Sequence, residues 1–150
     1  NKKIFKLYKI RTMYKSAPIL GTHEVSKSNY LKVGKLLRAV KIDELPQIIN
    51  YLRGELNMVG PRPGMPNQDK LTEERDKQNI FKCMPGITGL SQILGYDMSN
   101  PELLSKVDKL YIENKSIKLD IDIFIATFLV NRRKLIKNKF INEITKFENV

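Results

Sequence analysis

Apolar residues recur at helical spacing in several stretches of this 150-residue chain. Between residues 45 and 53 they follow the i, i+3, i+4, i+7 rule, at Leu45, Ile48, Ile49 and Leu52. This spacing predicts a helix of about three turns that ends near Gly54. A second helix is predicted over residues 99–116, where Ser99 or Asn100 can act as the cap and Pro101 occupies the first position.

The remaining segments give weaker patterns. Residues 30–40 predict a short helix interrupted by Gly34, and the charged residues 69–78 predict a surface helix. Residues 3–13 are rich in aromatic and branched side chains, which predicts a strand. Three stretches rich in proline, glycine or serine predict loops or turns: residues 16–28, 57–68 and 84–90.

Length and composition favour one domain that spans residues 1–150. We expect the α/β (α+β) class: a helix-rich single domain with a small sheet, proline-rich ordered loops and interfacial amphipathic segments. The single cysteine, Cys83, excludes an internal disulfide and any multi-cysteine zinc site.

The net charge of +11 is concentrated at the two ends of the chain. Two stretches without acidic residues carry it: Lys2, Lys3, Lys6, Lys9, Arg11 and Lys15 in the first, and Arg132, Arg133, Lys134, Lys137 and Lys139 in the second. The other basic residues equal the 16 acids in number. Basic ends suggest a polyanionic partner, and the apolar and aromatic residues beside them favour an anionic membrane surface over nucleic acid. A solvated basic tail or edge strand is the alternative.

The longest nearly apolar run, residues 117–130, is too short and too charged to cross a bilayer, which needs about twenty mostly apolar residues. The first residues do not have the pattern of a signal peptide. We therefore expect this run to lie on a membrane surface at most.

The stretch "KIDELPQ" places two adjacent carboxylates, Asp43 and Glu44, just before the helix predicted from Leu45. Asp43 could be the N-cap of that helix, with Glu44 and Pro46 in its first turn. Alternatively, one carboxylate could act as a nucleophile or base while its neighbour holds a divalent cation. The second interpretation requires phosphate-binding partners.

Two turn-rich motifs could supply them. In "GPRPG", Pro61 and Pro63 fix the backbone around Arg62, which suits the presentation of a guanidinium to a phosphate. In "PGITG", the backbone at Gly86, Thr88 and Gly89 could bind an anion. Both motifs also occur as ordinary surface turns. The only histidine, His23, lacks acidic, serine or cysteine partners nearby in the sequence, which favours a structural role.

Five motifs in this order resemble the bacterial sugar transferase family, the monotopic phosphoglycosyl transferases: "FKLYKIRTM", "GKLLR", "KIDELPQIINYLRGELNMVGPRPG", "PGITGLSQILG" and "YIENKSIKLDI". The resemblance covers about residues 2–133. Members of this family normally open with a re-entrant membrane helix upstream of the region matched here, and we expect that helix to lie outside this sequence.

The resemblance implies the transfer of a sugar 1-phosphate from a UDP-sugar to polyprenol phosphate at the cytoplasmic face of the bacterial inner membrane, in O-antigen, capsule or glycan synthesis. It assigns Asp43 as the nucleophile that forms a covalent phospho-sugar intermediate, and Glu44 as a ligand of Mg²⁺. It also places Arg62, Arg38 and Arg11 at recurrent basic positions and Asp120 at a recurrent acidic one. Capping and catalysis by the acidic pair are compatible in this scheme.

Two other classes of function remain open. One is a basic nucleic-acid-binding module, which the lack of tryptophan and of clustered aromatic residues disfavours. The other is a non-catalytic scaffold at the membrane surface, in which the acidic pair only caps a helix.

Overall fold

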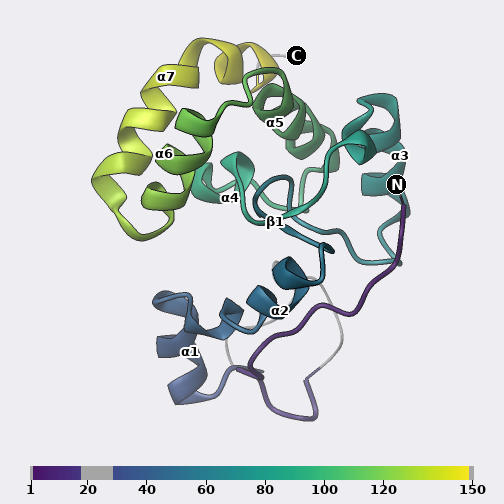
Figure 1. Cartoon of the computed structure of the whole chain (residues 1–150), viewed down its shortest axis with the longest axis vertical. Helices are drawn as coiled ribbons and strands as arrows, with labels where there is room; N and C mark the ends of the chain where they lie inside the picture. Colours follow the sequence, from purple (N-terminus) through teal and green to yellow (C-terminus); the bar gives the residue numbers. More distant parts are fainter. Residues whose placement is uncertain (1, 18–28, 149–150) are drawn as a thin grey trace. The chain divides into compact units, whose positions relative to one another are not determined.

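The computed structural model describes residues 2–17 and 29–148. Contacts divide the chain into two compact units (Figure 1). We call Ile4–Leu56 the N-terminal unit, and Asn57–Val150, together with Asn1–Lys3, the C-terminal unit. Most of the loop predicted for residues 16–28, with His23, lies outside the described residues.

The C-terminal unit is helix-rich with a small sheet, which confirms the expected fold class. Its elements are β1 (Asn57–Val59), α3 (Asp69–Lys77), η3 (Ile80–Lys82), β2 (Gly86–Thr88), α4 (Leu90–Leu94), α5 (Pro101–Glu113), α6 (Ile117–Phe128) and α7 (Val130–Glu148). Helices α6 and α7 pack against each other (Figure 1). The core is built from one face of each of several elements: Val59, Leu90, Ile93, Val107, Leu110, Tyr111, Leu119, Ile123, Ala126, Ile136, Phe140 and Ile144.

The helix predictions in this unit are confirmed. Asn100 caps α5, since its side-chain oxygen accepts a hydrogen bond from the Leu103 amide at 3.1 Å. Ser116 caps α6 in the same way through the Leu119 amide at 3.2 Å. These caps satisfy amides that have no partner within the helix. The start of α5 was predicted from its cap, whereas the helix start after Ser116 was not predicted.

The two strands lie where the sequence predicted turns, so that prediction is wrong for residues 57–59 and 86–88. β1 and β2 pair in parallel, with Asn57 opposite Gly86 and Val59 opposite Thr88. Glycine permits a very close backbone approach here, because a Cβ on Gly86 would lie 2.1 Å from the Gly60 nitrogen. Strands of three residues are too short to show an alternating pattern.

The N-terminal unit contains α1 (Lys32–Ala39), the 3-10 turn η2 (Ile42–Glu44) and α2 (Gln47–Leu52). Gly34 does not interrupt α1. It lies inside the helix, where a Cβ would come within 2.1 Å of the Thr12 carbonyl oxygen. The glycine therefore serves the packing of α1 against the first residues of the chain.

The strand predicted for residues 3–13 is wrong. The segment is extended, but only Met13 pairs, in an isolated antiparallel bridge with Tyr30. Its side-chain composition favours extended backbone, yet a strand also needs a neighbouring strand to accept its hydrogen bonds. Here the backbone partners at Lys6, Tyr8 and Ile10 come from α2 and η2 instead.

Candidate active site

The acidic pair lies in η2, and both residues are buried. Asp43 is 4% exposed and Glu44 is 9% exposed. Helix α2 begins after Pro46, which has no side-chain acceptor, so the interpretation of Asp43 as its N-cap is wrong. Burying a carboxylate without a partner costs folding free energy. Since helix capping does not account for this pair, its burial has another cause.

The extended N-terminal segment supplies a partner for the Glu44 carboxylate and another for the Asp43 backbone. The Lys9 ammonium lies 3.2 Å from Glu44 Oε1, with the Lys9 side chain 28% exposed. The Ile10 amide donates a hydrogen bond to the Asp43 carbonyl oxygen at 3.0 Å. Lys9 is thus a site residue that the sequence analysis missed, since nothing in the sequence distinguishes it from the other lysines of the basic end.

Asn50 fastens this segment to α2. Its side chain accepts a hydrogen bond from the Tyr8 amide at 3.1 Å and donates to the Lys6 carbonyl at 2.8 Å and to Glu55 Oε2 at 2.7 Å. Arg53 adds a hydrogen bond to the Tyr8 hydroxyl at 2.8 Å. The polar side of α2 therefore faces inward and holds the segment that carries Lys9.

The other predicted basic residues of the N-terminal unit are Arg38, which shortly precedes the acidic pair in the sequence, and Arg11, which shortly follows Lys9. Arg38 is in the last turn of α1, with its guanidinium stacked 4.7 Å from the centre of the Tyr30 ring. Its carbonyl accepts a hydrogen bond from the Lys41 amide, which starts the turn into η2. Arg11 is exposed on the extended segment, two residues beyond Lys9.

Arg62 belongs to the C-terminal unit and follows β1 directly. The Pro61 carbonyl accepts a hydrogen bond from the Gly86 amide, and the Gly60 amide donates to the Thr88 carbonyl, both at 2.9 Å. The "GPRPG" and "PGITG" motifs therefore lie side by side. The Gly86 amide is engaged with a protein carbonyl in this arrangement, and anion binding by this stretch stays a prediction.

Asp120 lies in the first turn of α6, beside the end of β1. It accepts a hydrogen bond from the Tyr111 hydroxyl at 2.7 Å, and that hydroxyl also lies 3.2 Å from the Val59 carbonyl oxygen. Burial, together with the hydrogen bond to Asp120, raises the pKa of Tyr111. The Thr88 hydroxyl is bonded to that of Thr127 at 2.8 Å. The predicted site residues thus form two sets, one in each unit.

Within the described parts of the chain, no three His, Cys, Asp or Glu side chains form a group that could hold a metal ion by themselves. Mg²⁺ is usually bound by one or two carboxylates together with substrate phosphates and water. The Glu44 carboxylate could supply one such ligand, and Mg²⁺ binding by Glu44 stays a prediction.

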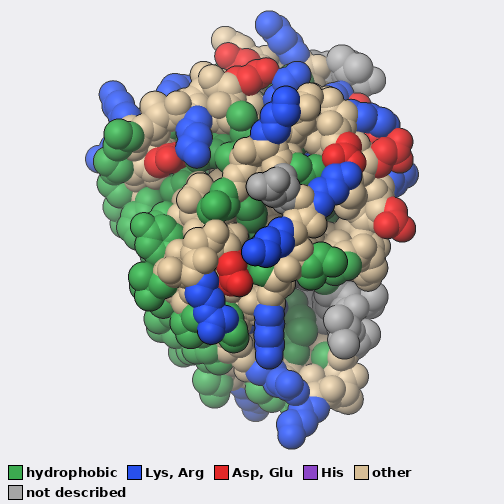
Figure 2. Space-filling view, turned by 45° about the vertical axis from the view of Figure 1, so that its right-hand side comes forward, with side chains coloured by type: hydrophobic (Ala, Val, Ile, Leu, Met, Phe, Trp, Pro, Cys, Tyr) green, Lys and Arg blue, Asp and Glu red, His purple; other side chains and the backbone are tan. Residues whose placement is uncertain are grey.

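Both units expose apolar side chains at helical spacing. On and before α2 these are Leu45, Ile48, Ile49 and Leu52, so the apolar face of this helix points outward. On α6 they are Ile117, Ile121, Phe124 and Phe128, opposite the buried Leu119, Ile123 and Ala126. Figure 2 shows hydrophobic side chains over a broad part of the surface, with lysine and arginine side chains beside them. No helix within residues 2–17 or 29–148 is both long and apolar enough to span a bilayer.

A model of the bacterial sugar transferase family matches residues 1–134. The chain is 39% identical, over 83% of its length, to the uncharacterized sugar transferase EpsL of Bacillus subtilis. It is 31% identical, over 82% of its length, to a UDP-glucose:undecaprenyl-phosphate glucose-1-phosphate transferase of Caulobacter vibrioides. An Aeromonas hydrophila UDP-N-acetylgalactosamine-undecaprenyl-phosphate N-acetylgalactosaminephosphotransferase is 32% identical over 82% of the chain. These matches cover 61%, 49% and 31% of the respective relatives.

Proposed function

This chain belongs to the bacterial sugar transferase family, and we propose that it is the catalytic part of an enzyme that transfers a sugar 1-phosphate from a UDP-sugar to undecaprenyl phosphate or a related polyprenol phosphate. The names of the Caulobacter and Aeromonas relatives supply the donor and acceptor classes. The observation that carries the proposal is the buried Asp43 and Glu44 pair, which is placed in η2 without capping a helix.

In the proposed reaction, a carboxylate oxygen of Asp43 attacks the β-phosphorus of the UDP-sugar. The bond between this phosphorus and the bridging oxygen breaks, and UMP leaves with the electron pair. The sugar phosphate is then held on Asp43 as an acyl phosphate. A phosphate oxygen of the polyprenol phosphate attacks the same phosphorus, which releases the Asp43 carboxylate and yields a polyprenol diphosphate sugar.

The surroundings of the pair suit this chemistry. A carboxylate attacks a diphosphate only if the negative charges are offset, and Lys9 places a positive charge 3.2 Å from Glu44. Mg²⁺, if held by Glu44, would supply further neutralisation of the diphosphate charge. The hydrogen bond from the Ile10 amide to the Asp43 carbonyl holds the backbone that carries the nucleophile.

Arg62 is the proposed contact to the donor phosphates in the C-terminal unit. The flanking Pro61 and Pro63 restrict the backbone, and a guanidinium binds phosphate oxygens through paired donors. Arg38 and Arg11 are proposed as further phosphate contacts from the N-terminal unit. Gly86, Thr88, Gly89 and Asp120 are the other residues of the C-terminal unit that we propose contact the donor.

We also propose that the enzyme works on the anionic cytoplasmic face of the inner membrane. In each unit taken by itself, one helix has an outward apolar face suited to enter the interface as amphipathic helices do: α2 in the N-terminal unit and α6 in the C-terminal unit. Each nearby lysine or arginine of the basic ends would add about 1 kcal/mol of attraction to anionic lipid. Because α2 lies in the same unit as Asp43 and Glu44, its contact with the membrane would bring the acidic pair to the surface that holds the lipid acceptor.

The test is UMP release by the full-length protein from a panel of UDP-sugars, with Mg²⁺ and detergent-solubilised undecaprenyl phosphate. Asp43→Asn should abolish release, and Glu44→Gln should reduce it strongly. Glu73→Gln is the matched control, because Glu73 is an exposed acid that pairs only with Lys77 at 2.9 Å among the described ion pairs. It should keep wild-type activity.

A phospho-sugar adduct trapped on the protein, and missing in Asp43→Asn, would identify the nucleophile. If Asp43→Asn releases UMP at the wild-type rate, the proposed mechanism is refuted. If the folded wild-type protein releases no UMP from any donor, the scaffold interpretation takes its place.

A further inference from the structure

We infer that a buried ion pair between Arg75 and Asp108 positions the Arg62 segment for the donor phosphates, so that Arg75 is a positioning residue of this enzyme. The inference rests on the proposed role of Arg62 in the function described above. All the residues involved lie in the C-terminal unit.

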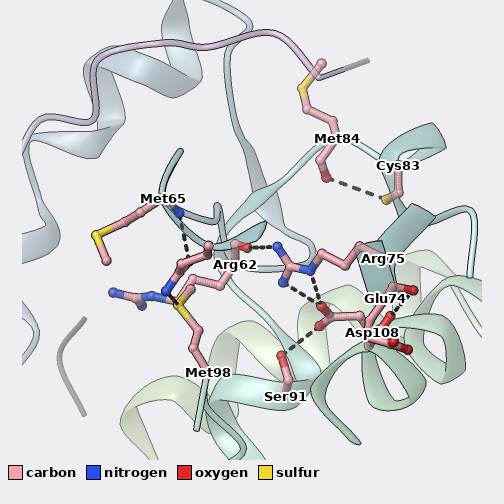
Figure 3. A network of polar contacts seen from close by, with 11 residues as sticks. Arg62, Met65, Glu74, Arg75, Cys83, Met84, Ser91, Met98 and Asp108 are labelled. Carbon is pink, nitrogen blue, oxygen red and sulfur yellow. Dashed lines mark hydrogen bonds and ion pairs between the residues drawn. The ribbon is translucent and has the colours of Figure 1, made fainter. Parts of the chain in front are cut away.

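The Arg75 guanidinium bridges two parts of this unit (Figure 3). On one side, Nε and Nη2 donate to the same carboxylate oxygen of Asp108, at 3.1 and 2.6 Å. On the other side, Nη1 donates to the Arg62 carbonyl at 2.8 Å. The second Asp108 oxygen accepts a hydrogen bond from the Ser91 hydroxyl at 2.9 Å. The network therefore connects α3, α5 and α4 to the middle of the Pro-Arg-Pro segment.

Stability alone does not explain this ion pair. The side chains of Arg75 and Asp108 are only 4% and 2% exposed, and removing two charges from water is costly. Apolar pairs of similar volume often replace buried ion pairs with no loss of stability. An apolar pair could pack α3 against α5, but it could not donate a hydrogen bond to the Arg62 carbonyl. The feature that only arginine supplies is a rigid set of donors that can serve a carboxylate and a carbonyl together.

The bonded carbonyl is well placed to control the Arg62 side chain. Pro61 and Pro63 fix their own φ angles, and Pro63 also restricts the backbone of Arg62, which precedes it. Holding the Arg62 carbonyl then fixes the orientation of the peptide plane between Arg62 and Pro63. Figure 3 shows the Arg62 carbonyl facing Arg75, while the Arg62 side chain extends in the opposite direction. The Met65 amide is held by the Gln68 side chain at 2.8 Å, which fixes the far end of the same loop.

The test replaces the pair by apolar residues, Arg75→Met with Asp108→Leu, in the full-length protein. We expect a loss of thermal stability no larger than that of leaving the Ser91 hydroxyl without its acceptor, faster hydrogen exchange at the Gly60, Arg62, Gly64 and Met65 amides, and a rise of at least about tenfold in the donor KM. Adding Arg62→Ala to the double variant should raise the donor KM little further, although Arg62→Ala by itself should raise it strongly in the wild type. Glu102→Gln, which removes the exposed pair with Lys106 on α5, is the control and should change none of these quantities.

The inference is overturned if the double variant folds, its loop amides exchange hydrogen at the wild-type rate, and Arg62→Ala raises the donor KM as much in it as in the wild type. If the double variant does not fold, Arg75→Lys replaces it, since lysine keeps the charge beside Asp108 but cannot also reach the Arg62 carbonyl. If the wild type releases no UMP from any donor, the proposed function fails while loop exchange still decides whether Arg75 holds the Arg62 segment.

Discussion

The substitution Asn50→Ala tests how the acidic pair is held in place. Asn50 is completely buried, and its side chain makes three hydrogen bonds. Two of them join the extended N-terminal segment to α2, and the third joins Asn50 to Glu55, just after α2. Alanine fits the helix but removes all three bonds. The segment that carries Lys9 and the Ile10 amide should then separate more readily from η2.

The size of the effect follows from the bonds that are lost. The two bonds to the segment join neutral groups and are worth about 1 kcal/mol each, while the bond to the Glu55 carboxylate does not hold the segment. Lys6 is exposed and Tyr8 is half-buried, so water can replace part of the loss. We expect a net effect of about 1.5 kcal/mol on local opening, which is roughly a tenfold rise in the open population.

Native-state hydrogen exchange measures this opening directly. Exchange at the Tyr8 and Ile10 amides should accelerate by roughly the same factor, because both donate to η2 or α2 in the closed state. Asn114→Ala is the matched control: it removes a single asparagine hydrogen bond, to the Leu110 carbonyl at 2.9 Å in the C-terminal unit. Tyr8 exchange that stays within about threefold of wild type in Asn50→Ala would refute this account of how the segment is held.

Three further predictions concern packing, pH and the membrane. Gly34→Ala should destabilise the protein by roughly 2 kcal/mol or more in thermal unfolding, because the added Cβ would lie 2.1 Å from the Thr12 carbonyl. Burial and the hydrogen bond to Glu148 raise the pKa of Tyr96 to about 12. The bond should therefore stabilise the fold fully below pH 10, and this stabilisation should fade between about pH 10 and 12. Unfolding titrations of Tyr96→Phe should no longer show this pH dependence. Leu52→Ser should leave the stability of the fold unchanged, since Leu52 is 77% exposed. It should weaken binding to anionic vesicles about tenfold in sedimentation assays. Unchanged vesicle binding would exclude this face of α2 as the membrane contact.

Local sequence was sufficient for the helices that carry their own start signals. Asn100 with Pro101, and the charged pattern of residues 69–77, act within one or two turns, so α5 and α3 appear where they were predicted. Their apolar positions also predict which face enters the core. The acidic pair and the Pro-Arg-Pro segment stood out for a similar reason: the residue types and their spacing are themselves the signal.

The sheet and the partners of the acidic pair depended on contacts between distant residues. β1 and β2 form because glycines in two turn-rich stretches let their backbones meet, whereas the β-rich residues 3–13 have only the single bridge at Met13. The outward apolar face of α2 follows from the buried Asn50, which no helical pattern would predict. Lys9 reaches Glu44 across 35 positions of sequence and Arg75 reaches Asp108 across 33. The sequence, through its motifs and the family they resemble, pointed to the acidic pair and the arginines of the proposed chemistry. Only the tertiary structure showed Lys9 and the contacts that hold these residues, because hydrogen bonds and ion pairs depend on distances that chain folding creates.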